Sequence, residues 1–195
     1  MKKRRNTHQR NQAEQRYKKH RQRNVLAKPG IHDFIIVLDH LKAGFNVPKI
    51  FRSAQAFGAK AVHLVNIPPF DPAPAKGAFK YVPAVFHEDF ANCYANLKQQ
   101  GYQPYILEPQ GGKALHHDAL AKNAAFIFGN EELGISFDAD EYPDIRRLFI
   151  PQHGPVESLN VSIAASITMY EYVRQHSPDN YFVAGDFVNA DAEKN

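Results

Sequence analysis

The sequence lacks several features that would place it in well-known classes of protein. It has one cysteine, Cys93, in 195 residues, which excludes a disulfide framework and a Cys-rich zinc site and fits a reducing compartment such as the cytoplasm. No apolar run approaches the roughly 18 residues that a membrane span needs. The basic N-terminus is followed by no apolar stretch, so we expect no signal peptide.

Acidic residues are nearly absent from the first 24 positions. Residues 1–24 hold ten Lys/Arg against one acid, Glu14, a net charge of +9; the other 171 residues hold 14 Lys/Arg against 19 Asp/Glu, a net charge of −5. Large apolar side chains are scarce there too, Tyr17 being the only aromatic one, so we expect a flexible arm or a transient helix.

Two interpretations of this arm remain open, a solubilising tail and a segment that binds the phosphates of RNA or DNA. Ten cations with one acid exceed what solubility requires, which favours nucleic acid. The candidate RNA-binding residues are Lys2, Lys3, Arg4, Arg5, Arg10, Arg16, Lys18, Lys19, Arg21 and Arg23.

The rest of the chain after residue 24 has the apolar content of a folded protein and the length of one domain, which we place at residues 25–176. A polar tail follows at 177–195, with a weak apolar patch at 181–183. Apolar runs predict strands over residues 34–38, 61–65, 105–107, 124–128 and 148–150. Helical spacing predicts helices over residues 47–57, 87–100 and 158–174, and residues 113–121 are expected to form one or two helical turns. This alternation predicts an α/β fold with an open, mostly parallel sheet and helices on both faces.

Ligands of such sheets bind beyond the carboxyl ends of the strands, so three segments there are candidate sites. In the first, Asn46 can cap the helix that follows, and Arg52 points away from its apolar stripe; alone, Arg52 is typical of a solvated arginine. In the second, Gly129 ends a strand and lets a ligand approach the backbone. In the third, Ser158 is a good N-cap for the last helix, whose small residues at 162–166 permit close packing on the sheet or on a partner's helix.

Histidine is common, at ten residues, but its pattern does not predict a metal site. His116 and His117 are adjacent, so both cannot easily face one ion, and no Cys pair or His-Glu-x-x-His motif accompanies them. Cys93 lies inside a predicted helix and is expected to be packed rather than nucleophilic. We therefore expect no metal.

Three segments, taken in order, resemble the three motifs of the SpoU/TrmH family, the S-adenosylmethionine-dependent RNA ribose 2′-O-methyltransferases of the SPOUT superfamily. They are Asn46–Gly58 with Arg52, Phe128–Gly134, and Ile150–Ser162. The resemblance covers roughly residues 32–175. It implies methylation of a ribose 2′-hydroxyl in tRNA or rRNA, and a homodimer in which the last helix lies in the interface and Arg52 reaches the partner's cofactor site.

The resemblance also implies a C-terminal trefoil knot that holds S-adenosyl-L-methionine, an exception to the rule that chains do not thread loops. The implied cofactor contacts are Leu107, Gly129, Ile150, Ser158 and Leu159. The implied catalytic residues are Arg52, Asn46, Glu131, Ser158 and Asn160. Because an arginine is effectively always protonated, orientation and electrostatic stabilisation by Arg52 are easier to defend than proton abstraction, with Asn46 holding Arg52 or its loop in place.

The chain departs from the family at the position after Glu131, which is often Gly and is Glu132 here, adding a negative charge near the cofactor loop. The Pro-rich loop at 67–75 is either a substrate-facing feature or a plain connector. Two other functions stay open: a non-catalytic RNA-binding or ribosome-assembly factor on the same fold, and a small-molecule nucleotide-binding enzyme, which would lack the usual phosphate loop.

Overall fold

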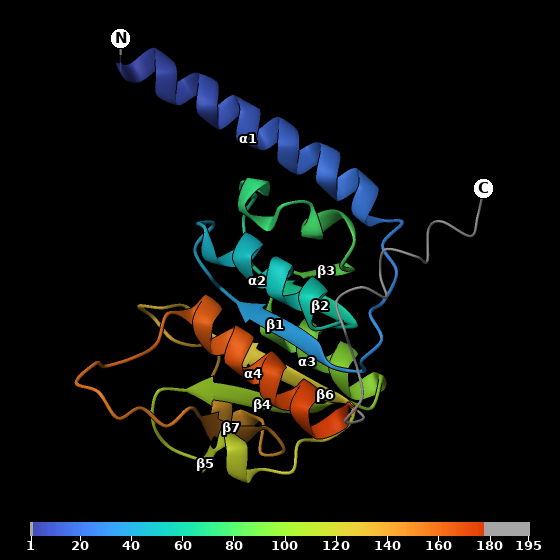
Figure 1. The fold of residues 1–195 in the computed structure, drawn as a ribbon, viewed down its shortest axis with the longest axis vertical. Helices are drawn as coiled ribbons and strands as arrows, with labels where there is room; N and C mark the ends of the chain where they lie inside the picture. Colours follow the sequence, from blue (N-terminus) through green and yellow to red (C-terminus); the bar gives the residue numbers. More distant parts are fainter. Residues whose placement is uncertain (1, 178–195) are drawn as a thin grey trace.

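The protein is built on a seven-stranded sheet in which every pair of neighbouring strands is parallel (Figure 1). The computed structural model describes the backbone of residues 2–177 and the side chains of residues 11–177, so the apolar patch at 181–183 lies outside it. The sheet order is β3-β2-β1-β6-β4-β7-β5. The strands are β1 (Ile35–Asp39), β2 (Ala61–Val65), β3 (Ala84–His87), β4 (Gln103–Glu108), β5 (Lys113–Ala114), β6 (Ala124–Phe128) and β7 (Arg146–Phe149).

Residues 2–177 also form four α-helices and four short 3-10 helices. The α-helices are α1 (Lys2–Asn24), α2 (Asn46–Ala56), α3 (Phe90–Gln99) and α4 (Val161–His176), and the 3-10 helices are η1 (Ala73–Ala75), η2 (Ala78–Lys80), η3 (Leu115–His117) and η4 (Ala139–Glu141). None of the helices in residues 2–177 combines the length and the apolar character that a bilayer crossing requires.

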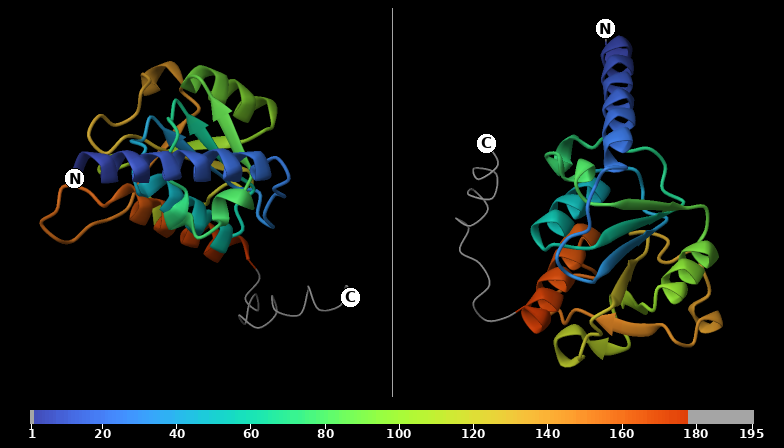
Figure 2. Two further views of the ribbon diagram at one scale, coloured as in Figure 1. Left: turned by 90° about the horizontal axis from the view of Figure 1, so that it is seen from above. Right: turned by 90° about the vertical axis from the view of Figure 1, so that its right-hand side faces the viewer.

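Helices cover both faces of the sheet, as the sequence predicts. Helices α2 and α4 lie side by side on one face, and α3 covers the other (Figures 1 and 2). Strand β1 is buried along its whole length; alternate residues such as Ile36 and Leu38 pack toward α2 and α4, while Ile35 and Val37 pack toward α3. A continuous apolar run is the expected pattern for a strand covered on both sides.

Two segments differ from the predicted elements. The sequence pattern does not predict strand β3, because it is a half-buried edge strand of four residues with a weak apolar pattern. Since β3 includes His87, helix α3 begins later than the predicted residue 87, at Phe90 after the N-cap Asp89. Residues 113–121, expected as one or two helical turns, form the two-residue strand β5 and the 3-10 helix η3.

The expectation of a flexible arm or a transient helix at residues 1–24 is corrected in part by the structure, in which Lys2–Asn24 is a single helix whose C-terminal part is docked on the body. Tyr17 is 4% exposed and packs against Phe70 and Phe79, with ring centroids 5.3 and 5.7 Å away. Asn24 donates to the backbone carbonyls of Phe79 and Val82, both at 2.7 Å.

The Pro-rich loop supplies part of this docking surface. Arg16 donates to both carboxylate oxygens of Asp71, from Nε at 3.1 Å and from Nη2 at 2.7 Å. Phe70 from the same loop is buried and contacts Phe51 of α2 as well. The loop is therefore more than a plain connector, because its side chains contact both α1 and α2. The N-terminal end of α1 extends past the body (Figure 2).

Candidate functional site

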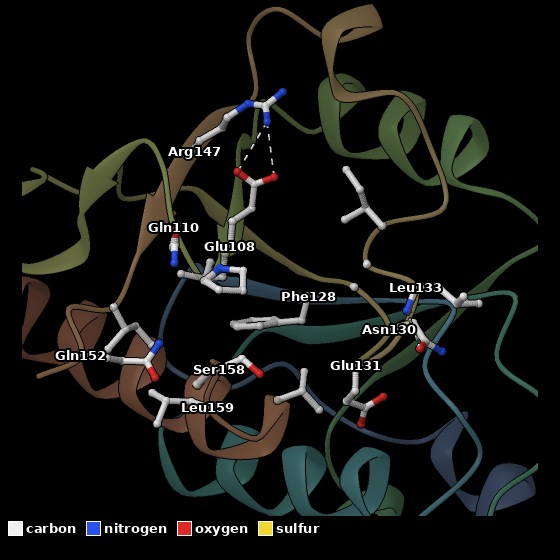
Figure 3. Close-up of a pocket in the computed structure, with 18 residues that line it drawn as sticks. Glu108, Gln110, Phe128, Asn130, Glu131, Leu133, Arg147, Gln152, Ser158 and Leu159 are labelled. Atoms are coloured by element: carbon white, nitrogen blue, oxygen red, sulfur yellow. Dashed lines mark hydrogen bonds and ion pairs between the residues drawn. The ribbon is translucent and has the colours of Figure 1, made fainter. Parts of the chain in front are cut away.

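A cavity of about 790 Å³ opens at the carboxyl ends of β4, β6 and β7 (Figure 3). Its walls come from the segments that follow these three strands and from the start of α4. It is lined by residues 107–110, 128–131, 133–135, 147, 150, 152, 158, 159, 161 and 164. Parallel strands expose their carboxyl ends at one edge, which is where ligands of open α/β sheets bind.

All five residues expected to contact the cofactor line this one cavity. They are Leu107, Gly129, Ile150, Ser158 and Leu159. The reason for glycine at 129 differs from the prediction, because a Cβ there would lie 2.5 Å from the carbonyl carbon of Gly134. Gly129 thus permits close approach of the protein's own loop, which shapes the cavity wall.

Asn130 fixes the loop at 129–134, and the sequence reasoning did not single it out. Its backbone N–H and C=O pair with Gly134 at 2.7 and 2.9 Å. Its side-chain oxygen accepts from the N–H groups of Glu132 and Leu133, and its side-chain nitrogen donates to the His40 carbonyl at 2.8 Å. An asparagine two positions after the end of a strand is the only sequence signal, since such side chains commonly bond the backbone of a following turn.

Asp39 at the end of β1 holds the chain just after this loop. Its carboxylate is fully buried and accepts from the Ser136 backbone N–H at 2.6 Å and from the Ser136 hydroxyl at 2.8 Å. Burial raises the pKa of Asp39 above its ordinary value, and the two hydrogen bonds from Ser136 oppose that rise. The loop at 129–134 is therefore fastened to β1 on both sides.

Asn46 connects the loops of all three motifs. It donates a short hydrogen bond to Glu131 and accepts one from Asn160 Nδ2 at 3.3 Å. The prediction that Asn46 caps α2 is wrong: Phe45 is at the cap position and makes no side-chain capping bond. The side chain of Asn46 is thereby available for the contact between loops.

The cap of α4 is also displaced from the prediction. Asn160, not Ser158, precedes the helix, and its side-chain oxygen accepts from the Ser162 N–H at 3.0 Å and from the Ser162 hydroxyl at 2.6 Å. Ser158 instead lines the cavity. Asparagine is as good a cap as serine, so composition alone did not decide between the two positions.

Two of the acidic side chains around the cavity are paired with cations. Glu132, the departure in the second motif, forms an ion pair with Lys42 from the loop after β1. Glu108 accepts from Arg147 Nη1 at 3.3 Å, as Figure 3 shows, and Arg147 also pairs with Asp140 at 3.0 Å. The extra negative charge of Glu132 is therefore compensated locally rather than directed into the cavity.

Arg52 is the one candidate catalytic residue that the fold does not bring to this group. It is exposed on α2, it does not line the cavity, and it makes no hydrogen bond or ion pair within the described residues. Glu131 and Ser158 line the cavity, and Asn46 and Asn160 brace it. A single chain thus assembles four of the five candidates.

Gln152 offers an unused polar group to a ligand. Its side chain lies in the cavity wall (Figure 3), and its Oε1 atom is buried without a hydrogen-bond partner in the part of the chain that the structure describes. A buried acceptor left unpaired costs roughly 1–3 kcal/mol. A ligand that carries an N–H or O–H group would satisfy it.

The candidate RNA-binding cations of α1 fall into three sets. Arg16 is paired with Asp71, the Arg21 guanidinium lies 4.4 Å from the centre of the Phe86 ring, and Lys18 pairs with Glu14 at 2.9 Å. Lys19 and Arg23 are exposed. The side chains of the other five, Lys2, Lys3, Arg4, Arg5 and Arg10, lie outside the described residues.

Comparison with known proteins shows the family of the chain. The sequence model of the SpoU rRNA Methylase family matches residues 33–170, which spans all three motifs. The chain therefore belongs to this family of RNA methylases, and the family assignment made from the motifs is confirmed.

Individual relatives are similar over most of the chain. The tRNA (guanosine(18)-2′-O)-methyltransferase of Thermus thermophilus is 31% identical over 73% of this chain and 75% of its own. The 23S rRNA (guanosine-2′-O-)-methyltransferase of Xylella fastidiosa is 30% identical over 83% of this chain and 66% of its own. The SpoU methyltransferase AviRb from Streptomyces viridochromogenes, solved in complex with AdoMet, is 25% identical with a TM-score of 0.67, over 75% of this chain and 59% of its own.

Proposed function

We propose that this protein transfers a methyl group from S-adenosyl-L-methionine to a ribose 2′-hydroxyl in tRNA or rRNA. One observation carries the proposal: the loops of the second and third motifs form one cavity, and Asn46 of the first motif joins the two loops beside it. Family membership and the names of the relatives, which act on tRNA and rRNA, support the reaction and the class of substrate.

The cavity residues fit this cofactor. Leu107, Ile150 and Leu159 offer apolar surface to an adenine ring, and the unpaired Oε1 of Gln152 offers an acceptor to an amine or hydroxyl of the ligand. A cavity of this size is within the usual range for a cofactor-sized molecule. When bound, the cofactor supplies an electrophilic methyl group on a sulfonium sulfur.

The protein's own residues then act on the nucleophile. A ribose 2′-hydroxyl is a weak nucleophile and must give up its proton as it attacks, and we assign that proton to an RNA phosphate or to solvent water. Arg52, which stays protonated, orients the hydroxyl oxygen and stabilises the negative charge that develops on it. Glu131 and Ser158 hold the cavity walls, and Asn46 and Asn160 keep the two loops at a fixed separation.

A homodimer would bring Arg52 to the cavity of the partner. Arg52 is exposed on α2, and α2 lies beside α4. The small residues of α4 are used within the chain, where Ser166 contacts Ser53 of α2 at 2.8 Å. Helix α4 also exposes a stripe of apolar side chains spaced four and three residues apart, which is the surface that we assign to the partner. The stripe consists of Ile163 at 51%, Ile167 at 37% and Tyr170 at 60% exposure.

We also propose that residues 129–160 form the trefoil knot of the family. In support, the chain runs from β7, which lies beyond β4, back to α4, which packs against β6. The loops at 129–134 and 151–160 are neighbours through Asn46. We place the activity in the cytoplasm, where the proposed substrates occur and where a lone, buried thiol is common.

The cations of α1 would supply RNA affinity that does not depend on sequence. The rest of the chain has a net charge of −5, which alone would repel RNA. The N-terminal end of α1 extends beyond the body (Figure 2), so it can reach phosphates while the cavity holds the target ribose. In this proposal the docking through Tyr17 fixes the direction in which the charged helix projects.

Two measurements test the proposed reaction. Calorimetry with purified full-length protein should give one S-adenosyl-L-methionine site per chain, and a Leu159→Trp variant, which fills the cavity, should abolish it. Mapping of 2′-O-methyl groups in total RNA from cells with and without the gene should show at least one position that depends on it and is restored by the wild-type gene. Failure of both would favour the non-catalytic RNA-binding alternative.

A further inference from the structure

A buried cluster of three side chains lies outside the cavity and has no part in the proposed reaction. His63 is on β2, His87 ends β3 and Cys93 is on α3, all on the face of the sheet that α3 covers. His63 Nδ1 is 3.1 Å from His87 Nε2 and 3.8 Å from Cys93 Sγ, and the three atoms all lie within 4.8 Å of one another.

These separations match those around a tetrahedral transition-metal ion. Metal–nitrogen distances of about 2.0–2.1 Å and a metal–sulfur distance of about 2.3 Å place two ligand nitrogens about 3.3 Å apart and a nitrogen and a sulfur about 3.5 Å apart. The His63–His87 and His63–Cys93 distances of 3.1 and 3.8 Å lie close to these values, so small side-chain rotations are enough to meet them. The His87–Cys93 separation is also within 4.8 Å, so the three groups can reach one ion after side-chain rotation.

The surroundings keep the two imidazoles in the form that binds metals. Burial lowers the pKa of His63 to about 3, with His87 as the second cause, and burial also lowers the pKa of His87, which Asp89 partly offsets. Both rings are neutral at pH 7, and neutral imidazole is the metal ligand. Burial, assisted by Asp39, raises the pKa of Cys93 to about 12, so the thiol keeps its proton until a cation displaces it.

We propose that His63 Nδ1, His87 Nε2 and Cys93 Sγ bind one zinc-type transition-metal ion. Binding converts the Cys93 thiol to a metal-bound thiolate and releases one proton to solvent, and the N–H shared by the two rings moves to the distal nitrogen of one of them. The fourth position is taken by water, which enters beside His87, the one member of the cluster that is not fully buried. The ion would tie the edge strand β3 to β2 and α3.

The competing interpretation is a metal-free cluster in which the two neutral rings share one hydrogen bond against a packed thiol. The sequence does not predict a metal here, because the three residues are 24 and 6 positions apart and follow no familiar spacing. The two interpretations predict different results when a divalent ion is added to protein from which a chelator has removed all metal: one bound ion per chain in the first case, and none at this cluster in the second. A thiolate ligand also has a spectroscopic signature that a surface histidine lacks.

The test uses full-length protein stripped with a chelator and titrated with Co²⁺, a coloured substitute for Zn²⁺. We expect one ion per chain, the intense visible bands of tetrahedral Co²⁺, and a thiolate-to-cobalt charge-transfer band. Cys93→Ser should remove that band and weaken Zn²⁺ binding by more than about 100-fold, since even a residue that only supports a ligand is worth 10–100-fold. Zn²⁺ should also raise the melting temperature of the wild type but not of Cys93→Ser.

The matched control is a His116→Gln, His117→Gln double variant, which removes a pair of adjacent histidines whose rings contact each other on η3. It should keep the band and the stoichiometry. Absence of a one-to-one complex, or binding that the double variant loses and Cys93→Ser keeps, would overturn the proposal. X-ray absorption of the Zn²⁺-loaded wild type decides without any variant: one sulfur and two imidazoles support the site, and a shell of oxygen and nitrogen alone rejects it.

Discussion

Asn160 donates a hydrogen bond to Asn46 at 3.3 Å, although the two residues are 114 positions apart. The same Asn46 donates to Glu131. One half-buried amide thus sets the distance between the loop after β6 and the loop before α4. Because these loops form two walls of the cavity, the shape of the cavity depends on a residue outside its lining.

Replacing Asn46 with alanine should slow methyl transfer more than it destabilises the fold. Each hydrogen bond is worth about 0.5–1.5 kcal/mol, so loss of both at the site corresponds to a roughly 5- to 150-fold lower rate. The free energy of unfolding should fall by less, because both bonds are exposed and the groups left behind on Glu131 and Asn160 can bond to water instead. Initial rates of label transfer to RNA and urea unfolding measure the two. Asn96→Ala on α3 is the control; an equal loss of rate there would refute the role of Asn46.

Arg52→Ala should abolish most methyl transfer while the cofactor affinity and the oligomeric state stay as in the wild type. The residue lies outside the cavity of its own chain, so its removal leaves that cavity intact. Loss of one electrostatic contact to a developing oxyanion costs about 10²–10³ in rate. Label transfer to RNA, calorimetry with the cofactor and size-exclusion chromatography measure the three quantities. A rate equal to that of the wild type would remove Arg52 from the reaction.

Mixing Arg52→Ala with Leu159→Trp chains tests whether Arg52 acts on the partner's cavity. Under the dimer proposal, the heterodimer joins the intact cavity of the Arg52→Ala chain to the arginine of the Leu159→Trp chain, so activity should reappear on mixing. If Arg52 served its own chain, no chain in the mixture would hold a complete site, and the mixture would stay inactive.

The converse mixture, wild type with the double variant Arg52→Ala, Leu159→Trp, is the control. Its heterodimer holds one intact cavity, that of the wild-type chain, which under the dimer proposal faces a partner without the arginine. This species should therefore be as slow as Arg52→Ala alone. A heterodimer with half of the wild-type activity would instead place Arg52 at the cavity of its own chain.

Gly129→Ala should destabilise the protein and weaken cofactor binding. The new Cβ would lie 2.5 Å from the carbonyl carbon of Gly134, so one of the two backbones must move. Overpacking of this kind costs about 1–3 kcal/mol, measurable by chemical unfolding. Gly154→Ala is the matched control, because a Cβ there meets nothing within 4 Å. Equal stability of the two variants would show that the loop at 129–134 adjusts freely.

Neutralising the N-terminal cations of α1 should flatten the salt dependence of RNA binding. The substitutions to glutamine are at Lys2, Lys3, Arg4, Arg5 and Arg10. Each lost phosphate contact lowers the slope of log K against log salt by about 0.7–0.9. Cofactor binding should be unchanged. The control exchanges Lys for Arg and Arg for Lys at the same positions, which keeps the charge and should keep the slope; an unchanged slope in the glutamine variant would mean that this end of α1 does not touch phosphate.

The Arg16–Asp71 pair should make the docking of α1 depend on pH. The hydrogen bonds from Arg16 lower the pKa of Asp71. A carboxyl whose pKa falls on folding adds stability above its unfolded pKa of about 3.9, and that stability is lost as the pH falls through the lower, folded pKa. Arg16→Gln should therefore reduce the free energy of unfolding by up to about 1 kcal/mol at pH 7 and by nothing at the lowest pH.

Lys19→Gln supplies the comparison for this pH experiment. It removes the same charge from an exposed position on α1. In urea unfolding at a series of pH values, any difference in the free energy of unfolding between Lys19→Gln and the wild type should be the same at neutral and at acid pH. A difference between Arg16→Gln and the wild type that persists in full at the lowest pH would point to packing rather than to the ion pair.

The centre of the fold could be predicted from the sequence, and its periphery could not. Strands β2 and β6 were placed at their observed bounds because both are continuous apolar runs buried on two faces. The docking of α1 was missed because Tyr17 is its only aromatic side chain. One such residue suffices here, since Phe70 and Phe79 surround it, and that partnership cannot be seen in local composition.

Site residues show the same division. The cofactor contacts implied by the family resemblance all line one cavity, because the parallel sheet gathers the ends of its strands at one edge. Asn130 was missed since its role lies in backbone contacts within a turn. The cluster of His63, His87 and Cys93 was missed because no single segment contains it; the pairing of β2 with β3 and the position of α3 create it.

The strand order also determines at what point during synthesis the central part of the sheet can form. Strand β1 lies between β2 and β6, and Ile35 pairs with Ala125, which is made much later in the chain. At 5–20 residues per second, a ribosome needs roughly 5–20 s to make that second neighbour. During that interval the inner edge of β1 is unpaired and open to other strands. The basic helix α1 is made first and acquires its docking surface at Phe70–Val82 while that edge is still open. A positively charged segment therefore accompanies the nascent chain through its most aggregation-prone stage.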